Sequence, residues 1–126
     1  MTDIKRVIDE IKEKIGARYE DNEAYLKLPY FLYRADASIG LKIFSEGDSL
    51  YISDMGTAYD YLDCMGVDAS SHKKRIDAIK KKFNIVENEL HEMIMEFPSE
   101  NRVSIQMFIS FFIGAISAIA YSYIGD

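Results

Sequence analysis

Aspartates that could support chemistry gather in the middle of the chain: Asp54, Asp60, Asp63 and Asp68. Two carboxylates held close together can act as general acid and base, or can bind a hard cation through their oxygens. Asp60 and Asp63 are spaced i, i+3, so they would be neighbours on one helix face. The corresponding enzyme hypothesis is a metal-dependent hydrolase or nuclease that uses Asp54. The structural alternative assigns these residues to a turn, a helix cap and a solvated surface.

Other residue types add little support for catalysis. His72 and His91 are isolated in the sequence, and neither lies at ligand spacing from the aspartates. The chain contains no GxSxG, P-loop, CxxC, HExxH or GxGxxG motif. Cys64 adjoins the apolar face of a predicted helix, so we expect a small core residue rather than a nucleophile. We therefore assign no catalytic residue, metal ligand or cofactor, and the existence of an activity stays open.

Cations form a second charged group, in a single predicted helix: Lys73, Lys74, Arg75, Lys80, Lys81 and Lys82. The two halves of this group fall on overlapping faces of the helix because seven residues make about two turns. The group is a candidate contact for the phosphate backbone of a nucleic acid. The alternative is a solvated helix face whose last cations favour the negative end of the helix dipole. No aromatic residue interleaves with the cations, and no nucleic-acid motif accompanies them.

The overall charge favours protein partners. The formal net charge is −6, which disfavours nonspecific binding of nucleic acid over the whole surface and suits a basic partner. The candidate contacts for a host protein are the acidic residues near the N-terminus, Glu20, Asp21 and Glu23, or alternatively the cationic helix. Simple solubility is the alternative role of this charge.

Length and composition indicate one globular domain over residues 1–126. Hydrophobic residues make up 48% of the chain, enough to form a core. Because Cys64 is the single cysteine, no intramolecular disulfide can form, which suits the cytoplasm. The charged N-terminal residues do not resemble a secretory signal peptide.

Alternating apolar residues and turn residues predict three hairpins. The first joins Ala17–Glu20 to Ala24–Leu28 and extends through Pro29 towards Tyr33. The second covers Leu41–Asp54, with a turn at Glu46-Gly47-Asp48. Its core-facing residues would be Leu41, Ile43, Leu50 and Ile52. The third covers Ile85–Phe97, where a helix is the competing interpretation.

Helical periodicity predicts three further elements: an amphipathic helix over Thr2–Ile15, a short helix over Thr57–Met65, and a helix from Ser70 or Ser71 to Phe83. Thr57 is the expected cap of the short helix, with Asp60 as its capping partner. The order of elements predicts an α+β fold, with an antiparallel sheet of hairpins packed on helices.

The segment Val103–Ile124 contains no charged residue and predicts a long apolar C-terminal helix. It is long enough for a membrane anchor, since about 20 apolar residues span a bilayer. Serines, tyrosines and Gln106 dilute its hydrophobicity, so a buried core helix is the preferred interpretation. Small residues recur at every fourth position and form a candidate self-association seam: Ser110, Gly114, Ala118 and Ser122.

The middle of the chain resembles an uncharacterised family of bacterial and phage domains of unknown function. The resemblance covers roughly residues 5–120 and includes LPY, LKIFSEGDSLYISD, RIDAIKKKFNI and ENEL. Its hallmark, a Thr-Asp-x-Gly turn after a strand, is matched by Ser53-Asp54-Met55-Gly56 with serine in place of threonine. The resemblance implies a phage or mobile-element protein acting in the bacterial cytoplasm, and it implies no catalytic residue.

Together these features predict a non-enzymatic interaction protein that binds and inhibits a host complex. Phage-encoded inhibitors of bacterial defence, including anti-CRISPR proteins, are similar in size and charge, which is an argument by analogy. The partners expected are a host protein or complex and a second copy of the chain. Three alternatives stay open: a nucleic-acid module using Lys73–Lys82, the metal-dependent hydrolase, and a tail-anchored membrane protein.

Overall fold

A computed structural model describes residues 16–20, 22–28, 39–97 and 105–124 of the chain. The predicted helix Thr2–Ile15 and the strand extension from Pro29 to Tyr33 lie outside these residues. The description below therefore concerns the sheet, the helices that follow it and the C-terminal helix.

The described residues form a six-stranded sheet in the order β1-β2-β3-β4-β6-β5, and every pairing is antiparallel. The strands are β1 (Gly16–Glu20), β2 (Glu23–Leu28), β3 (Ile39–Glu46), β4 (Ser49–Ser53), β5 (Val86–Glu87) and β6 (Met93–Glu96). Consecutive strands form the three predicted hairpins, so the strand interpretation of the third region is confirmed. Its second strand begins at Met93, whereas the sequence pattern placed the start at Leu90.

One face of the sheet carries the core. Ala24, Ile43, Ile52 and Met95 are paired in register from β2 to β6, and all of them are buried. The alternate residues Tyr25, Lys42 and Tyr51 are half-buried on the opposite face. The core positions predicted for the second hairpin are confirmed: Leu41, Ile43, Leu50 and Ile52 are buried.

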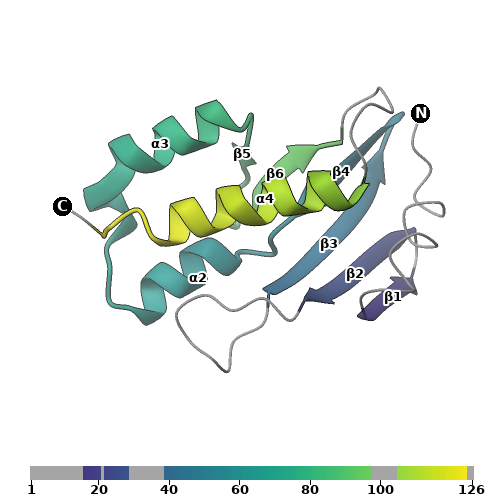
Figure 1. Cartoon of the computed structure of the whole chain (residues 1–126), viewed down its shortest axis with the longest axis horizontal. Coiled ribbons are helices and arrows are strands. Elements are labelled where there is room, and N and C mark those ends of the chain that lie inside the picture. Colours follow the sequence, from purple (N-terminus) through teal and green to yellow (C-terminus); the bar gives the residue numbers. More distant parts are fainter. Residues whose placement is uncertain (1–15, 21, 29–38, 98–104, 125–126) are drawn as a thin grey trace.

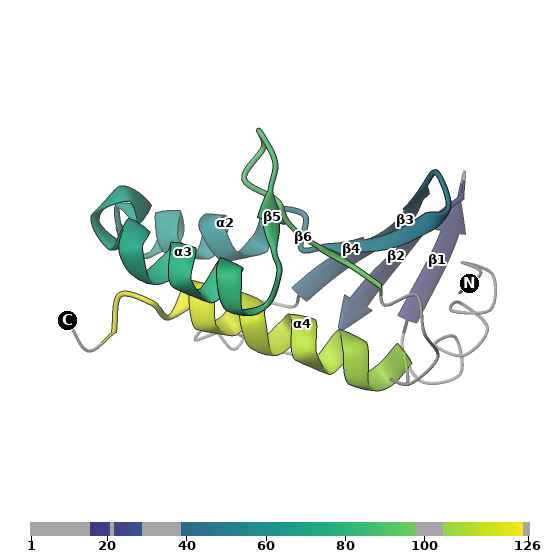
Figure 2. The same ribbon diagram turned by 90° about the horizontal axis from the view of Figure 1, so that it is seen from above.

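The helices are α2 (Thr57–Cys64), the 3-10 turn η1 (Ala69–His72), α3 (Lys73–Lys82) and α4 (Ile105–Ala120). Figures 1 and 2 show α4 alongside α2 and α3, with β1 and β2 near its N-terminal end and β5 next to α3. The buried side of α4 includes Phe108, Phe112, Ile116 and Ile119, and the Phe108 ring stacks on Phe97. The α+β fold and the core position of the C-terminal helix are therefore confirmed.

Within the described ranges, no helix combines the length and the apolar character needed to cross a membrane.

Several local predictions are wrong at helix ends. Cys64, the last residue of α2, and Met65, its C-cap, are exposed, whereas both were expected to join the core. The segment before α3 begins with a 3-10 turn capped by Asp68, which accepts a hydrogen bond from the Ser70 amide. The expected serine cap is therefore an aspartate cap two residues earlier.

Candidate functional site

The carboxylate of Asp54 joins three elements. Asp54 is fully buried at the end of β4. Its Oδ1 accepts hydrogen bonds from the amides of Gly56 and Met93, each at 2.8 Å, and its Oδ2 accepts one from the amide of Ala58 at 3.0 Å. The side chain thus ties the end of β4 to the first turn of α2 and to the start of β6.

The backbone after Asp54 explains this arrangement. Met55 and Gly56 both have positive φ, 56° and 83°, and fold the chain back over the Asp54 carboxylate. Gly56 is the N-cap position of α2, and the Thr57 hydroxyl donates to the Asp54 carbonyl at 2.6 Å. The predicted cap by Thr57 is therefore wrong, because Gly56 holds the N-cap position and the Asp54 carboxylate binds the amide of Ala58 in the first turn.

Burial raises the pKa of Asp54, and the hydrogen bonds from the three amides offset only part of this effect. A buried carboxylate that is occupied by backbone amides has no open position for substrate or metal. In the described part of the chain, no three His, Cys, Asp or Glu side chains could hold a metal ion together. Asp54 is therefore a structural residue, and the hydrolase hypothesis loses its central group.

Three of the six cations of α3 form ion pairs or hydrogen bonds with other groups of the protein. The Lys73 ammonium lies 2.6 Å from Asp77, and Lys80 lies 3.3 Å from Asp77 and 2.8 Å from Glu87. The Arg75 guanidinium donates to the carbonyls of Ser122 and Ile124, which follow the last turn of α4. Three exposed lysines are left to form the outer charge of α3: Lys74, Lys81 and Lys82. The six cations proposed to contact a nucleic acid therefore do not form one continuous free surface, because three of them are bound within the protein.

Of the three N-terminal acidic candidates, the structure describes the side chain of Glu23 alone. Asp21 and the side chain of Glu20 lie outside the described residues. Glu23 is half-buried, accepts a hydrogen bond from the Tyr25 hydroxyl at 3.1 Å and pairs with Lys42 at 3.6 Å. Its charge is therefore partly neutralised by a cross-strand neighbour.

The candidate self-association seam changes its surroundings along α4. Ser110 and Gly114 are exposed, Ala118 is half-buried and Ser122 is buried. Phe111 beside the exposed part is 56% exposed. A second copy could reach Ser110 and Gly114, but Ser122 faces the protein's own interior. Self-association stays a prediction, restricted to the first half of the seam.

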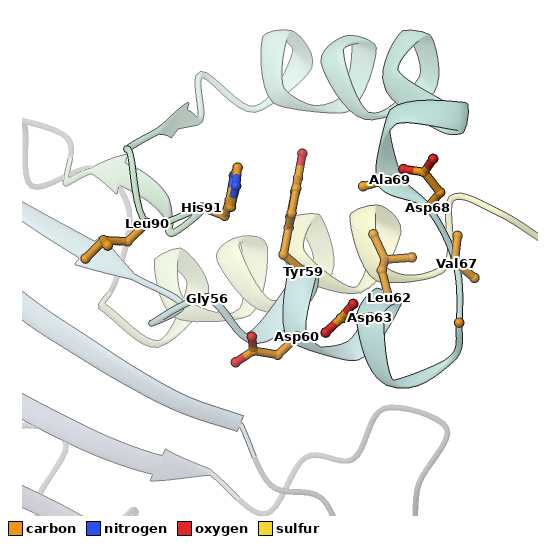
Figure 3. A pocket seen from close by; sticks show the side chains of 11 residues that line it. Gly56, Tyr59, Asp60, Leu62, Asp63, Val67, Asp68, Ala69, Leu90 and His91 are labelled. Carbon is orange, nitrogen blue, oxygen red and sulfur yellow. The ribbon is translucent and has the colours of Figure 1, made fainter.

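An open hollow of about 570 Å³ lies beside α2. Side chains and backbone from three places line it: Gly56, Tyr59, Asp60, Leu62 and Asp63 on α2, Gly66 to Ala69 on the following connection, and Leu90 and His91 on the β5–β6 turn. Figure 3 shows Tyr59 standing between His91 on one side and Ala69 on the other. The hollow therefore combines an aromatic ring, apolar side chains and carboxylates.

Glu87 holds Tyr59 and His91, which line one side of the hollow, through hydrogen bonds. Its Oε1 accepts hydrogen bonds from Lys80 at 2.8 Å and from the Tyr59 hydroxyl at 3.3 Å, and its Oε2 lies 2.6 Å from His91 Nδ1. Burial raises the pKa of Glu87, but the bonds from Lys80 and His91 outweigh it and leave the pKa lowered. Burial and the Glu87 charge raise the pKa of Tyr59. The Tyr59 hydroxyl is thus held as a neutral donor.

Stacking and a tight turn complete this wall. The rings of Tyr59 and His91 are nearly parallel, with centroids 4.9 Å apart and an interplanar angle of 5°. Asn88 orders the turn, because its Oδ1 accepts hydrogen bonds from the amides of Leu90 and Glu92. His91 has a φ of 60°, and Leu90 is 76% exposed at the rim. The turn therefore presents His91 to Tyr59 and Leu90 to solvent.

The rim of the hollow is acidic. Asp60, Asp63 and Asp68 are all exposed. Over the described ranges, neither Asp60 nor Asp63 forms an ion pair, and Asp68 bonds to the amide and hydroxyl of Ser70. These bonds lower the pKa of Asp68 and keep its carboxylate charged. The structure thus gathers three of the four predicted aspartates at one site and separates Asp54 from them.

Sequence reasoning missed Tyr59, Glu87 and Leu90, and it treated His91 as isolated. These residues come from α2 and from a hairpin about thirty positions away, so no local spacing links them. The weak signal available was the pair of asparagines at Asn84 and Asn88, which punctuates the hairpin that carries Glu87 and His91.

Comparisons with known proteins give no relative. No protein-family model, curated protein or solved structure matches the chain. The resemblance carried by Ser53–Gly56 therefore stays a prediction, while the turn itself is explained by the hydrogen bonds of Asp54.

Proposed function

We propose that this chain is a non-enzymatic interaction protein that binds a basic segment of a partner protein in the hollow beside α2. The observation that carries the proposal is a concave site that combines apolar side chains with exposed carboxylates, two of which form no ion pair with any described residue. Protein and ligand sites are typically concave, largely apolar and equipped with a few polar groups that orient the partner.

Charge complementarity supports a basic partner. Asp60, Asp63 and Asp68 ring the hollow, and the chain carries a net charge of −6. Negative potential at a low-dielectric wall attracts cationic segments and raises their association rate. Val67, which is half-buried, and Leu90, which is 76% exposed, offer apolar surface for the residues that flank a cation. The hollow is thus suited to a segment with both basic and apolar side chains.

The biological setting is a further part of the proposal. A phage or mobile-element protein that inhibits a host defence complex would need a small, acidic binding surface of this kind. This setting is supported by the short Ser53–Gly56 motif and by analogy of size and charge. Inhibition by occupation of a basic surface requires no catalytic group.

Selection from a random peptide library on the immobilised full-length protein tests the binding function. We expect enriched peptides to contain Lys or Arg next to an apolar residue. The double substitution Asp60→Asn with Asp63→Asn should weaken their binding about tenfold, because it removes two charges from the rim. The matched control, Lys81→Gln with Lys82→Gln, alters α3 instead and should leave binding within about twofold.

Ionic strength provides an independent check. Affinity should fall as salt rises from about 0.05 M to about 0.5 M, since exposed charges are screened over a shorter distance. Enrichment of neutral or acidic peptides, or basic peptides that bind the double variant as well as the wild type, would contradict the proposal.

A further inference from the structure

We infer that the hollow accepts an arginine side chain of the partner, with the guanidinium plane stacked on the open face of Tyr59. This inference rests on the proposed binding function and specifies which basic residue the site takes. It depends on the fixed position of the Tyr59 ring, on the shape of the hollow and on its acidic rim.

The Tyr59 ring is held before any partner binds. Its hydroxyl donates to Glu87, which is itself held by Lys80, and one ring face is covered by His91. Figure 3 shows the other face directed across the hollow towards Ala69. A ring that is already positioned loses little conformational freedom on binding, so more of the contact energy appears as affinity.

The open ring face favours a cation. The face of an aromatic ring carries negative charge density and attracts a cation within about 6 Å of the ring centre. The nearby cation of the protein, Lys80, is bound to Glu87 and Asp77 and so is already neutralised. Among the described residues, therefore, no cation of the protein covers the open face of the Tyr59 ring.

The flat shape of arginine fits this space better than lysine does. A guanidinium is planar and weakly hydrated, stacks on aromatic faces, and presents several N–H donors at its edge. Its edge would point towards the rim carboxylates, Asp63 and Asp68, while its methylenes pack on the half-buried Val67. A lysine ammonium is compact and strongly hydrated, and it offers no plane to stack.

Titration of the full-length protein with three short peptides tests this inference by NMR. The probes are acetyl-Gly-Leu-Xaa-Gly-amide peptides in which Xaa is arginine, lysine or citrulline, the uncharged analogue of arginine. We expect the arginine peptide to bind about fivefold more tightly than the lysine peptide and about tenfold more tightly than the citrulline peptide. Its titration should shift the Tyr59 ring signals.

Substitutions at Tyr59 separate stacking from charge. Tyr59→Leu should abolish the preference for arginine and leave lysine binding within about twofold. Tyr59→Phe keeps the ring and removes only the hydroxyl, so the preference for arginine should persist, and this variant serves if the leucine variant is unfolded. Tyr51→Leu, on the opposite face of the sheet, is the matched aromatic control and should leave the preference unchanged.

Equal binding of the arginine and lysine peptides, or arginine binding without a shift of the Tyr59 signals, would overturn the arginine site. If Asp60→Asn with Asp63→Asn still weakens basic peptides in that case, the proposed binding function survives. If no basic peptide binds here or in the library selection, both the binding function and the arginine site fail.

Discussion

Helices α2 and α3 both carry many charges, but the molecule uses the two sets differently. On α3, Lys73 and Lys80 pair with acidic side chains, and Arg75 binds carbonyls at the end of α4. On α2, Asp60 and Asp63 are exposed at the hollow and, across the described residues, pair with no cation. The helix with the longer run of like charge is therefore the weaker candidate for binding.

Charge density in a sequence therefore does not identify a binding site. A cation whose hydrogen bonds are satisfied within the fold stabilises the fold, and an incoming ligand would have to compete with that bond. An exposed carboxylate that has no cationic partner in the fold can still pair with a cation of a ligand. Asp54 and Asp60 repeat the contrast within one stretch, since Asp54 is fully buried and bonded to amides while Asp60 is exposed.

The largest expected effect is at Asp54. Asp54→Ala leaves the amides of Gly56, Ala58 and Met93 without their acceptor, and each unsatisfied buried donor costs about 1–3 kcal/mol. We expect the free energy of unfolding to fall by about 3 kcal/mol or more, measured by urea denaturation.

Asp60→Ala is the matched control for this substitution. Its side chain is exposed, so the free energy of unfolding should change by no more than about 0.5 kcal/mol. Equal effects of the two alanine substitutions would contradict the division between structural and available carboxylates.

An intermediate effect is expected at Arg75 on α3. Arg75→Ala removes the donor that binds the carbonyls of Ser122 and Ile124, and hydrogen bonds from a charged group contribute about 1.5–3 kcal/mol. Because the site is exposed, we expect a loss near the low end, about 1.5 kcal/mol, by urea denaturation. Lys74→Ala, at the adjacent exposed position, should change stability by no more than about 0.5 kcal/mol. If Lys74→Ala reduced the free energy of unfolding as much as Arg75→Ala, the effect would reflect the loss of any positive charge on α3 and not the hydrogen bonds of Arg75.

The smallest effect is expected at Glu87, and it should depend on pH. The folded state lowers the pKa of Glu87 from its ordinary value of 4.5, so its stabilising contribution is present above pH 4.5 and is lost as pH falls through the folded pKa. At neutral pH, the free energy of unfolding of the wild type should exceed that of Glu87→Gln by about 1 kcal/mol. This advantage should disappear on acidification, as measured by urea denaturation at several pH values. If the stability of the wild type relative to Glu87→Gln increased at low pH, the pKa of Glu87 would not be lowered in the folded state.

Asp54 should show the opposite dependence on pH. Its pKa is raised from 3.8 in the folded state, so its contribution is largest below pH 3.8 and declines as pH rises through the folded pKa. The two carboxylates thus affect the pH profile of stability with opposite signs, because burial dominates at Asp54 and cationic partners dominate at Glu87.

Much of the fold could be predicted because its signals are local. The alternation of Leu41, Ile43, Leu50 and Ile52 follows from the two-residue period of a strand, and each of these side chains is buried. Gly47 has positive φ in the predicted turn, and Asn84 has positive φ at the predicted end of the cationic helix. These conformations depend on the residue itself, so the sequence is sufficient to indicate them.

Other predictions failed because competing partners are not local. The cap of α2 comes from Asp54, whose burial depends on the pairing of β4 with β6. Cys64 and Met65 are exposed at the end of α2, which stops one residue before the predicted end, so the apolar face does not extend to them. No local pattern associated Tyr59 with Glu87 and His91.

Short-range periodicity and residue conformation specify the hairpins, the turns, the apolar C-terminal helix and the α+β class, so these features follow from the sequence. Which charges remain available, and where a ligand can contact them, depends on the folded arrangement. It engages Arg75 and Lys80, buries Asp54, and brings Tyr59 against His91 beside an acidic rim. The physical reason is that burial and hydrogen bonding depend on partners distant in sequence, which no local pattern can supply.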